Sequence, residues 1–226
     1  MRYWLVMPAA GIGRRFGTER PKQYAALVGR TVIEWALAPF LRDTRCAGVM
    51  VALAPGDPYW PTIAPAAVHT TPGGAERSDS VRNALAALAP RAAAEDWVLV
   101  HDAARPCLPG QDLERLLGSL AAHPLGGLLA TPAADTLKRA DAHGAVAETV
   151  DRAGLWRALT PQMFRYGPLC AALDQAHAAQ RRPTDEAQAL EWAGQHPVLV
   201  AGSAANLKIT TAADLTIAAA LLEAAA

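Results

Sequence analysis

The N-terminal part of the chain reads Leu5-Val6-Met7-Pro8-Ala9-Ala10-Gly11-Ile12-Gly13-Arg14-Arg15-Phe16-Gly17, and Pro21-Lys22-Gln23 follows soon after. A short apolar strand leads here directly into a turn of small residues. Glycine lets the backbone approach an anion closely, so that successive N–H groups can converge on phosphate oxygens. Arg15 and Lys22 add positive charge. The stretch predicts a cradle for a polyphosphate, although Gly11-Ile12-Gly13 by itself is equally typical of an ordinary strand-to-helix turn.

Lysine is scarce in this chain: Lys22, Lys138 and Lys208 stand against eighteen arginines. The ammonium of lysine is a compact point charge, whereas the guanidinium of arginine is a flat fork. All three lysines lie beside polar, turn-rich segments. Their presence indicates positions where a point charge is required, with chance placement as the alternative.

Apolar runs and helical patterns alternate along the chain. Short apolar runs occur at residues 3–8, 47–54, 97–101, 127–131 and 198–201. Apolar residues at helical spacing occur between them, at 31–42, 76–88, 111–123 and 169–180, and an alanine-rich helix closes the chain after residue 215. This order predicts one α/β domain over residues 1–226, with a mostly parallel sheet and helices on both faces. Ligands of such sheets bind beyond the carboxyl ends of the strands.

The segment 131–162 breaks this alternation. It contains short β-like pieces such as residues 146–150, separated by turns, and it shows no helical pattern. A β-arm that projects from an α/β core exposes strand edges, which proteins usually cover. We therefore expect this arm to pair with a second subunit.

Composition and charge exclude several classes of protein. The formal net charge is zero, with 21 basic and 21 acidic residues and no block of like charge. General binding to nucleic acid or to a membrane surface is disfavoured, because both require a basic excess. The N-terminus lacks the pattern of a secretion signal, so a cytoplasmic location is expected. Three widely spaced cysteines and scattered histidines indicate neither a disulfide framework nor a metal-ligand spacing.

Two further segments carry candidate chemistry. Asp102 follows the apolar run 97–100, where a carboxylate is well placed to hold Mg²⁺ or a substrate hydroxyl; the alternative is a turn or cap in which Arg105 is its partner. Residues 71–80 read Thr-Pro-Gly-Gly-Ala-Glu-Arg-Ser-Asp-Ser. Backbone N–H groups and the Ser80 hydroxyl in this segment are candidates for reading the edge of a base, and a plain capped helix is the alternative.

Hydroxyl and cationic side chains occur together in three groups that we assign to the arm, at residues 135–139, 149–152 and 159–162. Such groups suit a phosphorylated polyol, although each alone is also typical of a solvated turn. Residues 184–186 have the pattern of a helix N-cap with an acidic first turn. Residues 206–210 are predicted to place Lys208 in a short strand.

Nine short motifs occur in order along the chain, and together they carry a resemblance to a known family. They are Pro-Ala-Ala-Gly-x-Gly-Arg-Arg, Pro-Lys-Gln-Tyr, Gly-Gly-x-Glu-Arg-x-Asp-Ser, His-Asp-Ala-Ala-Arg-Pro, Asp-Thr-x-Lys, Thr-Val-Asp-Arg, Leu-Thr-Pro-Gln, Thr-Asp-Glu-Ala and Asn-x-Lys-x-Thr. The set extends from Met7 to about Asp214 and resembles the 2-C-methyl-D-erythritol 4-phosphate cytidylyltransferases of the non-mevalonate isoprenoid pathway.

The resemblance implies a Rossmann-like nucleotidyltransferase fold, CTP and a polyol phosphate as substrates, Mg²⁺ as cofactor, and a homodimer whose arms complete each other's sites. It implies Arg15, Lys22 and Lys208 as catalytic cations and Asp102 as a metal ligand. Nucleotide-binding residues would be Ala9, Ala10, Gly11, Gly74, Ala75, Ser80, Asp102 and Ala103. Acceptor-binding residues would be Thr160 and Thr184, with Thr136 and Arg152 from the other protomer.

Three alternatives remain open. A ribitol 5-phosphate cytidylyltransferase would share the loop motifs and differ in its acceptor pocket. A nicotinamide-dependent dehydrogenase is weakly indicated, because Thr31 occupies the region where an acidic residue should hold the ribose. A non-catalytic nucleotide sensor would keep the cradle, but the joint presence of Lys22, Asp102 and Lys208 disfavours it.

Overall fold

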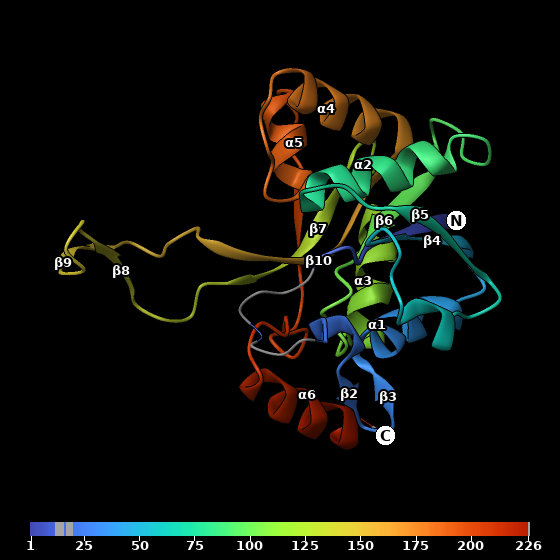
Figure 1. The fold of residues 1–226 in the computed structure, drawn as a ribbon. Helices are drawn as coiled ribbons and strands as arrows, with labels where there is room; N and C mark the ends of the chain where they lie inside the picture. The colour runs from blue at the N-terminus through green and yellow to red at the C-terminus, as the bar shows by residue number, and fades with distance from the viewer. Residues whose placement is uncertain (12–15, 17–19, 226) are drawn as a thin grey trace.

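A computed structural model describes residues 1–11, 16 and 20–225 of the chain (Figure 1). Its centre is a seven-stranded sheet, in the order β11-β7-β10-β6-β1-β4-β5, within these described residues. All of its strands run parallel except β10, which lies antiparallel between β6 and β7. The strands are β1 (Tyr3–Pro8), β4 (Cys46–Leu53), β5 (Val68–Pro72), β6 (Trp97–Val100), β7 (Gly126–Pro132), β10 (Trp156–Arg165) and β11 (Val198–Ala201).

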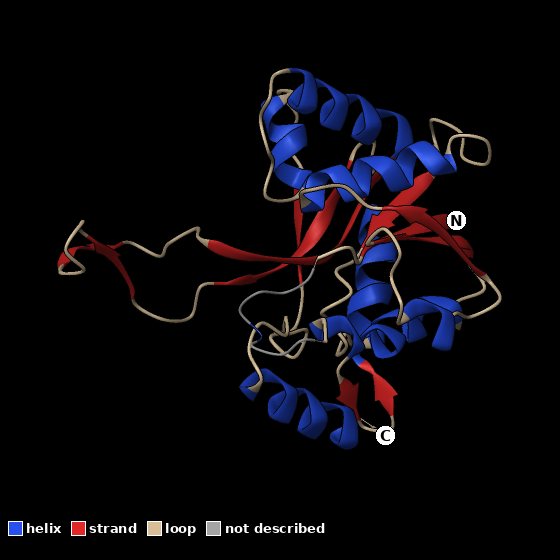
Figure 2. Ribbon diagram, in the orientation of Figure 1, coloured by secondary structure: helices blue, strands red, loops and turns tan. Residues whose placement is uncertain are grey.

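Helices cover both faces of this sheet, which Figure 2 shows as a red layer between blue ones. Side chains alternate between the faces along each strand, so Leu5 and Met7 join one core cluster while Val6 joins the other. The first cluster packs against α1 (Val32–Leu41) and α3 (Gly110–Leu120). The second packs against α2 (Arg77–Leu88), α4 (Tyr166–Ala178) and α5 (Glu186–Trp192). The mostly parallel α/β sheet expected from the alternating pattern is confirmed, and so is the Rossmann-like fold that the resemblance implies.

Smaller elements complete one side of the molecule. The helix α6 (Ala213–Ala224) follows a turn at Thr211 and packs through Ala218 in a cluster with Leu27 and Ile209. Leu27 belongs to a two-stranded hairpin of β2 (Ala26–Leu27) and β3 (Arg30–Thr31). Two 3₁₀ turns, at Lys22–Tyr24 and Trp60–Thr62, lie in the loops after β1 and β4. No helix of the described residues has both the length and the apolar character that crossing a bilayer requires.

A long β-arm leaves the sheet between β7 and β10 (Figure 1). Its outer part is a hairpin of β8 (Leu137–Ala140) and β9 (Val146–Val150), in which β8 residues are all exposed. Its base is formed where Trp156, Arg157 and Ala158 of β10 pair with the end of β7. The projecting excursion is therefore present, and its role in dimerisation stays a prediction.

Three local predictions were wrong or incomplete. Residues 159–162 do not belong to the arm, because they are buried in the sheet as part of β10. Residues 206–210 form no strand; they run as irregular backbone, and Ile209 N–H donates to the Ala104 carbonyl instead of to a ladder. The strands β5 and β10 and the helix α5 were not predicted, although residues 184–186 were interpreted as a helix start.

Candidate active site

A cavity of about 300 Å³ opens at the carboxyl ends of β1 and β6, where the parallel-sheet rule places ligands. Five separate segments line it: the loop after β1, the start of the 3₁₀ turn at Lys22, the loop into α2, the loop after β6, and the irregular segment after β11 that contains Lys208. Its lining residues are Pro8, Ala9, Ala10, Gly11, Lys22, Gln23, Gly74, Ala75, Glu76, Arg77, Ser80, Asp102, Ala103, Ala104 and Lys208. The structure thus brings together every predicted nucleotide-binding residue and two of the three predicted catalytic cations.

The loop after β1 is held by a buried amide. The Gln23 side chain donates through Nε2 to the carbonyls of Ala9, at 2.8 Å, and Gly11, at 3.1 Å. A Cβ atom added at Gly11 would meet no atom of the described residues within 4 Å, and Gly11 lines the cavity. The predicted role of Arg15 concerns a residue outside the described part of the chain.

The loop before α2 approaches the first loop very closely. A Cβ atom at Gly73 would lie 2.4 Å from the Cβ of Ala10, which explains why this position has no side chain. The Ser80 hydroxyl accepts a hydrogen bond from Gly74 N–H at 3.1 Å and donates to the Glu76 carbonyl. Ser80 therefore shapes the loop from behind. Gly74, which Ser80 holds through this hydrogen bond, and Ala75 line the cavity.

Asp102 lies among three cations at the end of β6. Its Oδ1 accepts from Arg77 Nε at 2.9 Å, and its Oδ2 accepts from Lys208 Nζ at 2.7 Å. The third cation is Arg105, whose Nε lies 3.7 Å from Oδ2 of Asp102. Burial alone would raise the pKa of this carboxyl, but the charges of Arg77, Lys208 and Arg105 outweigh burial and hold the pKa far below its usual range. Asp102 is therefore an anion at any physiological pH.

Arg77 is a residue of this site that the sequence interpretation missed. Its terminal nitrogens form a bidentate pair with Glu186, at 2.7 and 3.0 Å, while its Nε holds Asp102. The Glu186 side chain is 1% exposed and that of Arg77 is 25% exposed. Burial raises the pKa of Glu186, and Arg77 opposes that effect. One guanidinium thus joins the first turns of α2 and α5 to the end of β6. The motif Gly-Gly-x-Glu-Arg contains Arg77, but no spacing rule points to its partners.

A chain of hydrogen bonds lies beneath Asp102. Asp102 N–H donates to Thr160 Oγ at 3.1 Å, and the Thr160 hydroxyl lies 2.9 Å from His101 Nδ1. His101 Nε2 is 3.1 Å from the Arg105 carbonyl, which can only accept. Nε2 therefore carries the proton and Nδ1 accepts from the Thr160 hydroxyl. Burial lowers the pKa of His101 to about 4, so the ring is neutral and this direction of bonding is fixed.

Hydrogen bonds connect the irregular segment after β11 to the 3₁₀ turn at Lys22, to the loop after β6 and to β10. Lys22 Nζ donates to the Ile209 carbonyl at 2.7 Å, and Arg105 donates to the Asn206 carbonyl at 2.7 Å. Asn206 in turn donates to the Thr160 carbonyl. These contacts hold the backbone that presents Lys208 to Asp102.

The four predicted acceptor-binding residues lie apart within one chain. Thr160 is 4% exposed and its hydroxyl is engaged beneath Asp102, so the geometry gives it a positioning contact. Thr184 is exposed just before α5. Thr136 and Arg152 are exposed on the arm, where Arg152 donates to the Ala134 carbonyl. Their shared role stays a prediction that depends on a second protomer.

The donor set suits Mg²⁺ only in company with a substrate. Asp102 and Glu76 are the acidic side chains of the cavity lining. The described residues contain no cluster of three or more histidine, cysteine, aspartate or glutamate side chains that could hold a metal ion. Mg²⁺ commonly takes one or two carboxylates together with phosphate oxygens and water. The site therefore fits an ion that is held mainly by phosphate oxygens, with Asp102 as one ligand, and does not fit a cage built by the protein alone.

Comparison with known proteins gives a consistent result. The family model IspD, 2-C-methyl-D-erythritol 4-phosphate cytidylyltransferase, matches residues 3–224. A 2-C-methyl-D-erythritol 4-phosphate cytidylyltransferase of Pseudomonas fluorescens is 55% identical over 217 residues, which are 94% of this chain and 92% of that protein. A crystal structure described as 4-diphosphocytidyl-2C-methyl-D-erythritol synthase is similar at 39% identity, with a TM-score of 0.86 and 98% of both chains covered. The Francisella tularensis cytidylyltransferase structure is similar at 34% identity, with a TM-score of 0.84 over 98% of this chain and all of that one.

Proposed function

The chain belongs to the 2-C-methyl-D-erythritol 4-phosphate cytidylyltransferase family, and from this premise we propose that the cavity around Asp102 is its active site. The protein is a nucleotidyltransferase that converts CTP and 2-C-methyl-D-erythritol 4-phosphate to 4-diphosphocytidyl-2-C-methyl-D-erythritol and pyrophosphate. The observation that supports the location is the convergence of Lys22, Lys208 and Arg77 with the glycine-containing loop at one edge of the sheet.

CTP would lie across the cavity. The loop of Ala9, Ala10 and Gly11, which lines the cavity, would face the triphosphate, and the turn at Gly74 and Ala75 would face the cytosine edge. Because Ala75 has no polar side chain, only backbone groups of that turn can read the base. The close contact of the two loops at Gly73 supports this arrangement, since it fixes the distance between base site and phosphate site.

The reaction is an in-line transfer that requires no protein nucleophile. A phosphate oxygen of the acceptor forms a bond to the α-phosphorus of CTP, while the bond from that phosphorus to the bridging oxygen breaks and pyrophosphate leaves. The acceptor phosphate is already ionised at neutral pH. Lys22 and Lys208, together with Arg15, would offset the negative charge that accumulates at the phosphates, and preorganised charges of this kind give large rate effects. Asp102 holds Lys208 in place for this task.

Asp102 would help to hold Mg²⁺ beside the triphosphate, where the ion would neutralise part of the phosphate charge. Asp102 would supply one oxygen ligand, and phosphate oxygens and water the others. We expect Asp102→Asn to raise the Mg²⁺ concentration for half-maximal rate severalfold, because one anionic ligand is lost. An unchanged Mg²⁺ titration would limit Asp102 to the positioning of its cations.

The acceptor site would be completed by assembly. In a homodimer, we place Thr184 on the side of the protomer that holds CTP, with Thr160 supporting Asp102 beneath that site, and Thr136 and Arg152 on the arm of the second protomer. The exposed strand edges and polar side chains of β8 and β9 support this assignment, because a monomer leaves them without cover.

Pyrophosphate release tests the proposal directly. The protein would be incubated with each of four nucleoside triphosphates, and with either 2-C-methyl-D-erythritol 4-phosphate or ribitol 5-phosphate. The expected result is release with CTP and the methylerythritol phosphate. Preference for ribitol 5-phosphate would favour the alternative acceptor, and binding of CTP without any turnover would favour a sensor.

A further inference from the structure

A second cavity, of about 670 Å³, adjoins the nucleotide site and has no role so far. It lies between the base of the arm, the segment 204–210 and α6. Its lining is Arg105, Arg157, Ala158, Leu159, Ala204, Ala205, Leu207, Lys208, Thr210, Asp214, Ile217 and Leu221. Lys208 lines both cavities, so the two meet at this side chain.

The cavity carries more positive charge than its own carboxylate can balance. Asp214 is its only acidic lining residue among those described, and its Oδ2 accepts three hydrogen bonds at 2.8 Å from the backbone of Thr210 and Thr211 and from the Thr210 hydroxyl. These bonds, the one from the Thr211 backbone first, lower the pKa of Asp214 to about 2. Asp214 is thus engaged in the turn before α6, and it forms no salt bridge with a described cation.

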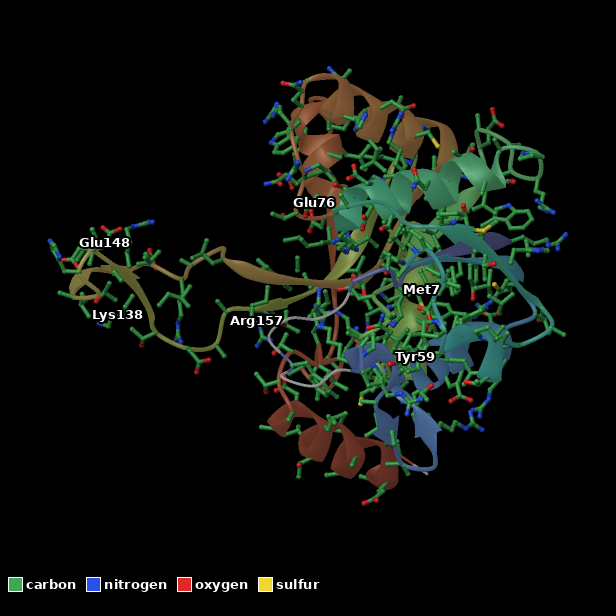
Figure 3. All side chains as sticks on the ribbon, in the orientation of Figure 1. Met7, Tyr59, Glu76, Lys138, Glu148 and Arg157 are labelled. Atoms are coloured by element: carbon green, nitrogen blue, oxygen red, sulfur yellow. The ribbon has the colours of Figure 1, made fainter. Side chains whose placement is uncertain are left out.

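Arg157 is the unbalanced cation. It is exposed at the base of the arm, where Figure 3 labels it, and it forms no ion pair with any described residue. Arg105 faces the same cavity, is 8% exposed, and has a buried Nε without a hydrogen-bond partner. Burial is the main cause that lowers the pKa of Arg105; the charge of Asp102 opposes this effect, and the charges of Arg77 and Arg157 add to it. Arg105 has Asp102 as its carboxylate partner, at 3.7 Å, whereas Arg157 lines the same cavity and has no carboxylate partner among the described residues. Two guanidinium groups on one open cavity, one of them without a counter-charge, are the arrangement expected where an anion binds.

The position of Arg157 indicates which of the two substrates supplies the anion. In an in-line transfer the attacking group approaches the α-phosphorus opposite the leaving pyrophosphate. The glycine-containing loop and Lys22 lie in the first cavity, whereas Arg157 lies beyond Lys208. We propose that Arg157 is a further substrate-binding residue, which contacts the phosphate of the polyol acceptor together with Arg105 and Lys208. The inference rests on the proposed function and adds a residue that the sequence interpretation did not include.

Steady-state kinetics of Arg157→Gln test the proposal. The KM for the acceptor should rise about tenfold or more, the effect expected for one lost charge-assisted hydrogen bond, while the KM for CTP changes by less than about twofold. Arg157→Lys should recover part of the loss, because charge remains while the fork is lost. Arg91→Gln is the matched control: it removes the same charge from an exposed position between α2 and β6 and should leave both KM values unchanged.

Binding of inorganic phosphate gives a second readout that needs no turnover. Phosphate, added against chloride at equal ionic strength, should raise the melting temperature of the wild type and of Arg91→Gln more than that of Arg157→Gln. An unchanged acceptor KM overturns the proposal. The proposal is also overturned if Arg157→Gln changes only the inhibition by pyrophosphate, or only the oligomeric state measured by sedimentation. If the wild type shows no turnover at all, the proposed function fails, whereas a phosphate response that depends on Arg157 still supports the anion site.

Discussion

Lys208 and Asp102 form an ion pair in the active site, and a bound triphosphate would compete with Asp102 for the lysine. In the structure Lys208 Nζ is 2.7 Å from Asp102, and 39% of the lysine side chain is exposed. A triphosphate that enters the cavity offers this ammonium a second anionic partner at the point where charge develops. Arg77 keeps the other carboxylate oxygen in place, so Asp102 retains a cation when Lys208 turns toward phosphate.

Removal of either cavity lysine should slow the reaction strongly. We expect Lys22→Ala and Lys208→Ala each to reduce turnover by about 10²-fold or more, by analogy with the loss of other electrostatic donors. Circular dichroism and melting curves check that both variants are folded. Arg91→Ala, an exposed cation away from the cavity, serves as the control. Near-normal pyrophosphate release by either lysine variant would contradict its assignment as a catalytic residue.

His101 should make stability depend on pH. Its pKa is lowered from 6.5 to about 4 by burial, so the unfolded chain binds this proton more readily than the folded one. The stabilisation is therefore complete above pH 6.5 and is lost as the pH falls toward 4, by up to about 3 kcal/mol. Urea unfolding of the wild type and of His101→Gln, compared at several pH values, isolates this contribution. Glu186, whose raised pKa acts in the opposite direction, is present in both proteins. Parallel pH profiles would show that His101 does not cause the loss.

At the scale of elements, one ion pair connects α2, α5 and β6. Glu186 is the first residue of α5 and Arg77 the first of α2, so their bidentate bond fixes the starts of both helices. The side chain of Gln162 on β10 provides a second link, because it donates to Asp185 and accepts from Ala187 N–H. The short helix α5 is thus held at its N-terminus from two sides.

Removing only Arg77 from its ion pair with Glu186 should lower the free energy of unfolding more than replacing both residues by apolar ones. Arg77→Met leaves the Glu186 carboxylate buried without a partner, and we expect a loss of about 3 kcal/mol in the free energy of unfolding. Arg77→Met combined with Glu186→Leu should recover most of it, while the activity of the double variant stays low because Asp102 has lost Arg77. Denaturant unfolding measures both.

The control is Arg82→Met, which opens the exposed pair of α2 with Asp174 and should cost less than about 1 kcal/mol. A double variant that is less stable than Arg77→Met would contradict the argument, since it would assign Glu186 a stabilising role without Arg77.

The sequence predicted correctly those helices and strands whose own apolar periodicity is clear. The strands β1 and β11 and the helices α1 and α3 have clear apolar periodicity, and the structure places them within a few residues of the expected positions. β5 was missed because it is short, half exposed and rich in threonine. β10 was missed because its first three residues are exposed at the base of the arm while most of the strand is buried, so one strand shows two patterns. Arg77 and Gln23 act through partners distant in sequence, which no local spacing reveals.

At the scale of the whole molecule, the arm reaches far from the sheet and contributes little to the core. Figure 3 shows Lys138 and Glu148 at its tip, distant from the labelled residues of the sheet and its helices. All residues of β8 are exposed, and Val146 of β9 is 65% exposed. An element of this length gains no stability from burial in a monomer, so a second subunit is the surface that would give it a role.

Mixing two inactive variants tests whether sites are shared between subunits. Arg152→Ala removes the cation that the arm would donate, and Lys22→Ala removes one from the cavity of the other protomer. In a mixed dimer, one of the two sites then has both residues intact. With equal amounts and free exchange, half of the dimers are mixed, so activity should recover toward about a quarter of the wild-type value. Each variant alone, carried through the same exchange procedure, is the control. If activity does not recover although subunit exchange is demonstrated, each protomer builds its site alone and the arm has another role.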